Sequence, residues 1–141
     1  MKTHDTLDRH LKRWAGGNKL REMVALTVSK LCSGAVVISA LVAQGELAGT
    51  LGEIQGDNAD GDAQKALDII ANDILVDEMR DSPVAYVASE EIEKALELNA
   101  GAPLSIAFDP LDGSSNIDTN LSVGTIFSIF ETGMGNGTTD S

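Results

Sequence analysis

The sequence predicts an α/β fold in which helices and strands form a mixed, layered sandwich. Three stretches of helical or continuously apolar character occupy the first 80 residues, and short apolar strands follow them at Val84–Ala88, Ser105–Phe108 and Val123–Phe130. Acidic residues stand directly after the first two of these strands. With 141 residues, 43% hydrophobic and 23% charged, the chain has the composition of one globular domain that can bury a core.

The first predicted helix runs through apolar residues spaced at i, i+4 and i+7. Asp5 or Thr6 can cap its start, and Gly16-Gly17 is expected to end it. A second, longer helix is expected from about Lys19 to Gln44, with Gly45 as its stop. It is apolar on most sides, so we expect it to pack between layers or at a subunit contact.

Met23 to Ala43 is the one stretch that could be taken for a membrane span. Lys30 and three serines lie inside it. A central Lys costs about 2.5–3.5 kcal/mol on insertion scales, so a buried helix in a soluble protein is the expectation. The net charge of −12 argues against partners that are nucleic acids or anionic membranes.

The third predicted helix begins at a cap on Asp62, after a polar loop at 56–62, and reaches about Arg80. Asp68 lies within its apolar face and needs either a partner or a place at the edge of that face. The apolar residues expected on the buried arc are Leu67, Ile69, Ile70, Ile74, Val76 and Met79.

The strand at Val84–Ala88 is followed at once by Ser89, Glu90 and Glu91. Adjacent carboxylates repel each other, so this pair is either solvated or held by a cation. Beyond it, Ile92 to Leu98 is ambiguous, although its propensity is helical.

The most informative stretch is Asp109 to Asp118, which reads Asp-Pro-Leu-Asp-Gly-Ser-Ser-Asn-Ile-Asp. Pro110 lacks a backbone donor, so the chain is expected to leave the sheet there, with Asp112 returning beside Asp109 after a tight turn. Two carboxylates at this spacing suit Mg²⁺, with Mn²⁺ possible. A lone pair of this kind is more often an Asp-rich turn, but the pattern here continues over ten residues.

The residues after this turn are small and rich in hydrogen-bonding groups. Gly113, Ser114, Ser115 and Asn116 can open a short helix whose N–H groups and hydroxyls cradle a phosphate. The two strand ends and the helix bearing Asp68 can converge at one edge of the sheet. Five carboxylates there would repel one another without cations, and with them they suit phosphoryl transfer.

The stretch Asp109 to Asp118 resembles the signature of class I fructose-1,6-bisphosphatases, in the lithium-sensitive sugar-phosphatase superfamily. The inositol branch usually has Asp-Gly-Thr-Thr-Asn where this chain has Asp112-Gly113-Ser114-Ser115-Asn116, which favours the sugar-bisphosphate branch. The resemblance covers roughly residues 20 to 130 and implies the N-terminal half of the sugar-phosphatase fold. It also implies a strand within Ile92 to Leu98.

The resemblance also implies roles for individual residues. Glu90, Asp109 and Asp112 match metal ligands, with the Leu111 carbonyl as a further oxygen. Asp68 and Glu91 match the pair that positions and activates the attacking water. The residues that match the binding site of the sugar's 1-phosphate are Asp112, Gly113, Ser114 and Ser115, with Asn116 supporting their turn.

The chain departs from the family pattern in two respects. The segment Gly17 to Val24 lacks the loop that binds inhibitory AMP in animal members. No Lys or Arg follows Lys94, whereas family members grip the far phosphate with basic residues, a Tyr and a further Glu ligand from a second half. We therefore expect 1–131 to be an N-terminal metal-binding domain and 132–141 a Gly/Thr-rich tail. The C-terminal substrate domain is expected to be absent, and the isolated chain nearly inactive.

The resulting expectation is Mg²⁺-dependent hydrolysis of the 1-phosphate of fructose 1,6-bisphosphate, in carbohydrate metabolism. Sedoheptulose 1,7-bisphosphate and a non-catalytic metal-binding role remain alternatives. The single Cys32 fits a cytoplasmic location, and family members suggest a homotetramer.

Overall fold

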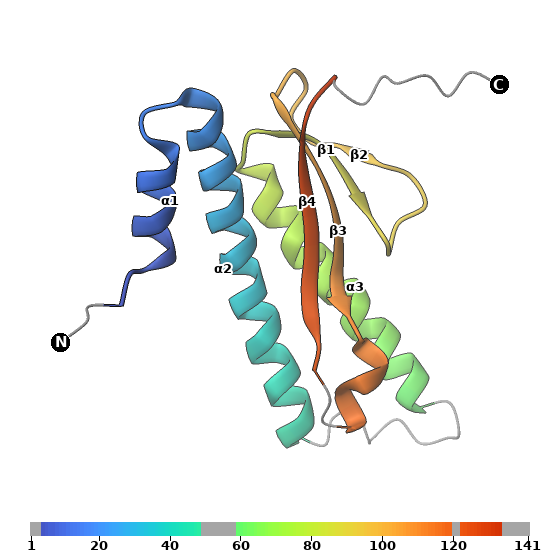
Figure 1. Cartoon of the computed structure of the whole chain (residues 1–141). Coiled ribbons are helices and arrows are strands. Elements are labelled where there is room, and N and C mark those ends of the chain that lie inside the picture. The colour runs from blue at the N-terminus through green and yellow to red at the C-terminus, as the bar shows by residue number, and fades with distance from the viewer. Residues whose placement is uncertain (1–3, 49–58, 120–121, 134–141) are drawn as a thin grey trace.

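The structure, a computed structural model, describes residues 4–48, 59–119 and 122–133. It has two layers, a four-stranded sheet and helices on one of its faces (Figure 1). The core lies between the layers, and the largest side chains fully buried in it include Leu31, Leu75, Met79 and Leu104. The mixed α/β fold is therefore confirmed.

Helix α1, Leu7–Ala15, has the predicted ends. The Thr6 hydroxyl accepts a hydrogen bond from the backbone N–H of Arg9 (3.3 Å), and Gly16 closes the helix at φ 55°. Asp8 joins it to the next helix by accepting a hydrogen bond from the Ser29 hydroxyl (3.0 Å).

Helix α2, Lys19–Ala48, runs past the predicted stop at Gly45. That prediction is wrong because one Gly costs a helix only about 1 kcal/mol, which flanking helix formers can offset. Asn18 caps the start of the helix, because its side chain accepts a hydrogen bond from the N–H of Arg21 (3.1 Å).

The prediction that α2 is buried holds on one side only. Leu31 and Ile38 belong to the core, whereas Val36 is 70% exposed and Leu26 and Val37 each 47% exposed. By length and composition, Lys19–Gln44 is apolar enough to cross a membrane, and 22% of its 18-residue apolar window is buried. The helix packs against both α1 and α3 (Figure 1). Its exposed apolar side chains form a face that the described residues leave uncovered.

Helix α3, Ala59–Arg80, ends as predicted but begins three residues before the expected cap at Asp62. An Asp is favourable both at the cap and in the first turn, so its presence does not distinguish the two positions. The predicted arc was too wide, since Ile69 and Ile70 are 58% and 46% exposed. Ala71, Leu75 and Met79 form the most buried stripe of α3, and Asp68 is half-buried beside it.

The sheet has the order β2-β1-β3-β4. Strands β1 (Val84–Ser89) and β3 (Leu104–Asp112) are parallel, and β2 (Leu96–Glu97) and β4 (Gly124–Glu131) pair antiparallel at the two edges. Within Ile92 to Leu98, only the two residues of β2 are extended.

Strand β3 continues through Pro110, so the prediction that the chain leaves the sheet there is wrong. The pairing of β3 with β1 ends at Phe108, whereas its pairing with β4 resumes at Asp112 after a register shift. The shift accommodates the missing N–H, and the Thr125 hydroxyl donates to the Pro110 carbonyl (2.9 Å).

Two other predicted segments are only partly described. Of the loop at 56–62, residues 59–62 are helical. In the tail, Thr132 and Gly133 follow β4 and the remainder lies outside the described ranges.

Candidate active site

The parallel pairing of β1 and β3 places Glu90 next to Asp109. Ser89 and Phe108 are register partners, and the backbone N–H of Glu90 donates to the Phe108 carbonyl (3.1 Å). Both strands therefore place an acidic residue at the same edge of the sheet, where the carboxyl ends of the two parallel strands lie. A shallow groove of about 350 Å³ on the helix-free face is lined by Glu90 and Asp109.

Asp112 joins this edge because β3 bulges. The carboxylate of Asp109 accepts a hydrogen bond from the Leu111 N–H (3.2 Å), an Asx turn that spans Pro110. Asp112 then lies at the end of β3 opposite Gly124, with an exposed side chain. The two aspartates of the turn thus lie at the same end of one strand, three residues apart.

Helix α3 contributes Asp68 to the same edge. The Ser114 hydroxyl donates to Asp68 Oδ2 (3.2 Å), which connects α3 to the turn across 46 residues of sequence. The other oxygen, Oδ1, is buried and has no hydrogen-bond partner among the described residues.

The charges of these side chains show how close together they lie. A hydrogen bond with the Asp109 side chain, and then its charge, raises the pKa of Glu90, and Glu91 and Asp112 raise it further. Burial raises the pKa of Glu91, with the charges of Asp68 and Asp109 adding to it.

Opposing effects also act on the pKa of Asp68. Burial raises its pKa, the hydrogen bond from Ser114 opposes that rise, and the charge of Asp109 adds to it. The structure therefore brings together all five carboxylates that the sequence singled out. The raised pKa values of Asp68, Glu90 and Glu91 mean that, without a cation, the protein disfavours the ionised form of each.

The donor set fits a divalent cation that prefers oxygen ligands. Neighbouring carboxylates that disfavour one another's ionised forms create an environment that a cation would stabilise. Among the described residues, however, no group of three or more His, Cys, Asp or Glu side chains is already arranged around one point as a metal would require. A bound cation would therefore have to draw these side chains closer.

The residues predicted to surround a phosphate follow directly. Gly113 adopts φ 81°, and the 3₁₀ helix η1 (Ser114–Thr119) begins after it. The N–H of Asn116 donates to the Gly113 carbonyl (2.8 Å), so it closes the turn. Ser114 is half-buried against Asp68, whereas Ser115 is exposed. The two serines therefore face different surroundings.

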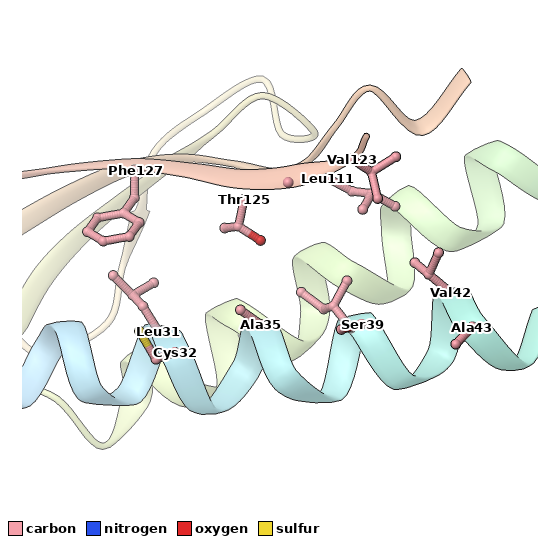
Figure 2. Close-up of a pocket in the computed structure, with 12 residues that line it drawn as sticks. Leu31, Cys32, Ala35, Ser39, Val42, Ala43, Leu111, Val123, Thr125 and Phe127 are labelled. Carbon is pink, nitrogen blue, oxygen red and sulfur yellow. The ribbon is translucent and has the colours of Figure 1, made fainter. Parts of the chain in front are cut away.

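Leu111 points away from the acidic edge. Its side chain lines an apolar cavity of about 490 Å³ between α2 and β4, together with Val123 and Phe127 (Figure 2). Only its backbone carbonyl could serve as the predicted ligand. The cavity is lined by Cys32 and Thr125 but by no Asp, Glu, His, Lys or Arg, so we do not place the chemistry there.

Ser89 has a role that the sequence analysis missed. Its hydroxyl accepts a hydrogen bond from the N–H of Glu91 (3.3 Å), which shapes the turn that presents both glutamates. A Ser two residues before an acidic position is the usual signal for such a turn, so this contact could have been predicted.

Comparison with known proteins shows the family of this chain. The profile of the family described as fructose-1-6-bisphosphatase, N-terminal domain, matches residues 7–141. The chain belongs to this family. Its match covers every residue of the acidic edge, from Asp68 on α3 to Asn116 after β3.

Individual relatives are close in sequence. A class 1 fructose-1,6-bisphosphatase of Nitrobacter hamburgensis is 53% identical over 127 residues, which is 90% of this chain and 37% of the relative. One from Azorhizobium caulinodans is 53% identical over 126 residues, 88% of this chain and 38% of the relative. The chain thus spans less than two fifths of the length of either relative.

A solved structure shows the same fold. The holo form of Leishmania major fructose-1,6-bisphosphatase superposes with a TM-score of 0.73 at 28% identity, over 92% of this chain and 39% of the other. The resemblance inferred from Asp109 to Asp118 is therefore confirmed at the level of family and fold.

Proposed function

We propose that this chain forms the metal-binding part of a phosphatase that hydrolyses the 1-phosphate of fructose 1,6-bisphosphate, yielding fructose 6-phosphate and phosphate. The observation that supports this most is the meeting of Asp68, Glu90, Glu91, Asp109 and Asp112 at one edge of the sheet. Membership of the fructose-1,6-bisphosphatase family supports the substrate class.

In this proposal the carboxylates divide into two groups. Glu90, Asp109 and Asp112, with the Leu111 carbonyl, would hold Mg²⁺ or Mn²⁺. The bound cation would withdraw electron density from the phosphate and neutralise its charge. The phosphate would lie against Gly113, Ser114 and Ser115, where backbone N–H groups and the Ser115 hydroxyl can donate to it.

Asp68 and Glu91 would act on the attacking water. Their raised pKa values indicate carboxylates able to accept a proton. The water oxygen forms a bond to phosphorus and the bond from phosphorus to the sugar oxygen breaks. One carboxylate takes the water's proton, and the leaving sugar oxygen is protonated from solvent. The Ser114 hydroxyl keeps Asp68 turned toward the turn while this happens.

The far phosphate of the substrate needs cations that this chain does not provide. No Lys or Arg follows Lys94, and a sugar bisphosphate has about four negative charges near neutral pH. We propose that turnover depends on basic residues outside these 141. A cytoplasmic homotetramer is proposed with it, for which the exposed apolar face of α2 offers one contact surface.

The deciding experiment is a Mg²⁺ titration of the purified chain, followed by calorimetry, with and without fructose 1,6-bisphosphate. We expect binding that is lost in Asp109→Asn and kept in Asp73→Asn, an exposed carboxylate on α3. Equal binding by both variants would contradict the proposed site. We expect this chain alone to release almost no phosphate. Release should become Mg²⁺-dependent when the basic half, meaning the second half of family members with its basic residues, is supplied.

The absence of Lys and Arg after Lys94 also favours a second candidate function, in which the chain binds metal without catalysis. It predicts the same titration but no phosphate release under any pairing. Release from sedoheptulose 1,7-bisphosphate rather than from the fructose compound would change the substrate and leave the chemistry unchanged.

A further inference from the structure

Two buried oxygens on α3 lack a hydrogen-bond donor, and they lie one helical turn apart. They are Oδ1 of Asp68 and Oδ1 of Asn72, and both are without a partner among the described side chains and backbone. Asn72 is only 6% exposed, whereas Asp68 is half-buried. An orphaned buried acceptor is unfavourable, so two neighbouring ones need a common explanation.

The i, i+4 spacing places the two side chains on one face of the helix. Their Cβ atoms are about 5–6 Å apart at that spacing, within reach of a side-chain hydrogen bond. Val76, the next residue along the same row, is 5% exposed and belongs to the apolar core. Asn72 is therefore the last polar residue between Asp68 and the core.

Two acceptors cannot bond to each other, but a carboxamide has a donor at its other end. Rotating the Asn72 amide by half a turn exchanges its oxygen for its NH₂ group, an orientation that heavy-atom positions scarcely distinguish. The NH₂ group would then face Asp68, and the amide oxygen would leave the buried position. This one rotation satisfies both orphaned atoms.

We propose that Asn72 is a positioning residue that donates from Nδ2 to Oδ1 of Asp68. Asp68 would then be held at both oxygens, by Asn72 on one and by the Ser114 hydroxyl on the other. A carboxylate held in this way has one orientation toward the turn at Asp109. Its catalytic meaning rests on the proposed function, but the hydrogen bond itself does not.

The bond is tested by NMR on the side-chain NH₂ group of Asn72 in this chain. In Asp68→Ala we expect its signal to move and its hydrogen exchange to quicken by about tenfold, the factor that one net hydrogen bond represents. Asn99 is the internal reference, because its NH₂ group donates to the carbonyls of Ser82 and Val84 (3.0 Å each). An unchanged Asn72 signal in Asp68→Ala would overturn the proposal.

Turnover gives a second reading in the enzyme that contains this chain and the basic half. Asn72→Leu, similar in size but without a donor, is expected to lower kcat by about tenfold with KM nearly unchanged. Asn72→Ser, which keeps a donor, is expected to recover part of that loss. A stability change with kcat unaltered in both variants would show a purely structural role and refute positioning.

If the unaltered enzyme released no phosphate, the proposed function would fail while the NMR result still decided the hydrogen bond. If turnover were normal and the Asn72 NH₂ signal did not change in Asp68→Ala, the positioning role alone would fail. The two failures are therefore distinguishable.

Discussion

Asp68 shows how one side chain connects sequence, packing and chemistry in this protein. It interrupts an apolar stretch of α3, where an unpaired carboxylate is costly. The fold offsets part of that cost with the Ser114 hydroxyl, but burial and Asp109 still raise its pKa. The ionised form of Asp68 therefore costs the folded protein stability at this position.

That cost predicts how stability changes with pH. Because the pKa of Asp68 is raised in the folded state, the stability it contributes is fully present below the ordinary carboxyl pKa. It is lost as pH rises through the raised value. In EDTA, Asp68→Asn should therefore stabilise the chain at pH 7 by less than about 1 kcal/mol, since a half-exposed group is partly screened.

Urea unfolding of both forms at neutral and acidic pH measures this difference. The gain should fade as pH falls to the ordinary carboxyl range, where Asp68 is protonated in both states. Asp73→Asn, on the same helix but exposed, is the control. A gain in Asp68→Asn that is as large in acid as at pH 7 would contradict the explanation.

Gly113 is the second residue on which the site depends. Its φ is 81°, and a Cβ there would lie 3.1 Å from the Ser122 carbonyl oxygen and 3.2 Å from Asn116 Nδ2. Gly113→Ala should lower the free energy of unfolding by about 2 kcal/mol, from backbone strain plus crowding. Gly101 has φ 79° and open space around it, so Gly101→Ala should show strain alone, about 1 kcal/mol. Chemical denaturation measures both, and equal losses would mean that the contacts around Gly113 do not matter.

At the scale of elements, the crossing of α2 and α3 depends on a small residue. Gly34 is buried, and a Cβ at this position would lie 2.7 Å from Leu75 Cδ2 and 3.3 Å from Glu78 Cγ. Leu75 is fully buried, so it has little room to move. The close approach of these two helices positions the face of α3 that presents Asp68.

Gly34→Ala therefore tests two opposing effects. Helix propensity favours Ala by about 1 kcal/mol, whereas overpacking costs about 1–3 kcal/mol. We expect a net loss of about 1 kcal/mol in the free energy of unfolding. A double-mutant cycle with Leu75→Ala should recover most of it, because that variant removes the crowded atom. Strict additivity would place the cause elsewhere.

At the scale of the whole molecule, the described helices cover one face of the sheet and leave the other face open. Ile126 and Phe130 of β4 are 57% and 55% exposed. Within the described ranges, β4 is an edge strand with no strand paired to its outer side. Exposed apolar edges promote association between chains. The net charge of −12 opposes it, though screening weakens that repulsion in salt.

We therefore expect the purified chain to self-associate more as salt is added. Ile126→Lys and Phe130→Lys should suppress this association while changing the free energy of unfolding by less than about 1 kcal/mol. Sedimentation velocity over a range of salt measures it. The contrast is Ile129→Lys, which places a charge against the core and should unfold the chain. Persistent association in both edge variants would direct attention to the apolar face of α2.

The local chemistry of this protein could be predicted from its sequence alone. Thr6 and Gly16 mark the ends of α1, and the two parallel strands are marked by apolar runs that end in acids. The ten residues from Asp109 to Asp118 identified the family. They could do so because the whole pattern lies in one continuous stretch of sequence. Gly45, Asp62 and Pro110 misled as boundaries, since each is an ambiguous local signal that packing or pairing overrides.

Only the tertiary structure decided which side chains meet. The parallel register that aligns Ser89 with Phe108 brings Glu90 beside Asp109, and the packing of α3 brings Asp68 to Ser114. It also decided which apolar residues are buried, since Ile69 and Ile70 share the chemistry of the core but face outward. Distances between segments far apart in sequence come from packing. The sequence could therefore supply the five carboxylates, but not the contacts that raise the pKa values of Asp68, Glu90 and Glu91.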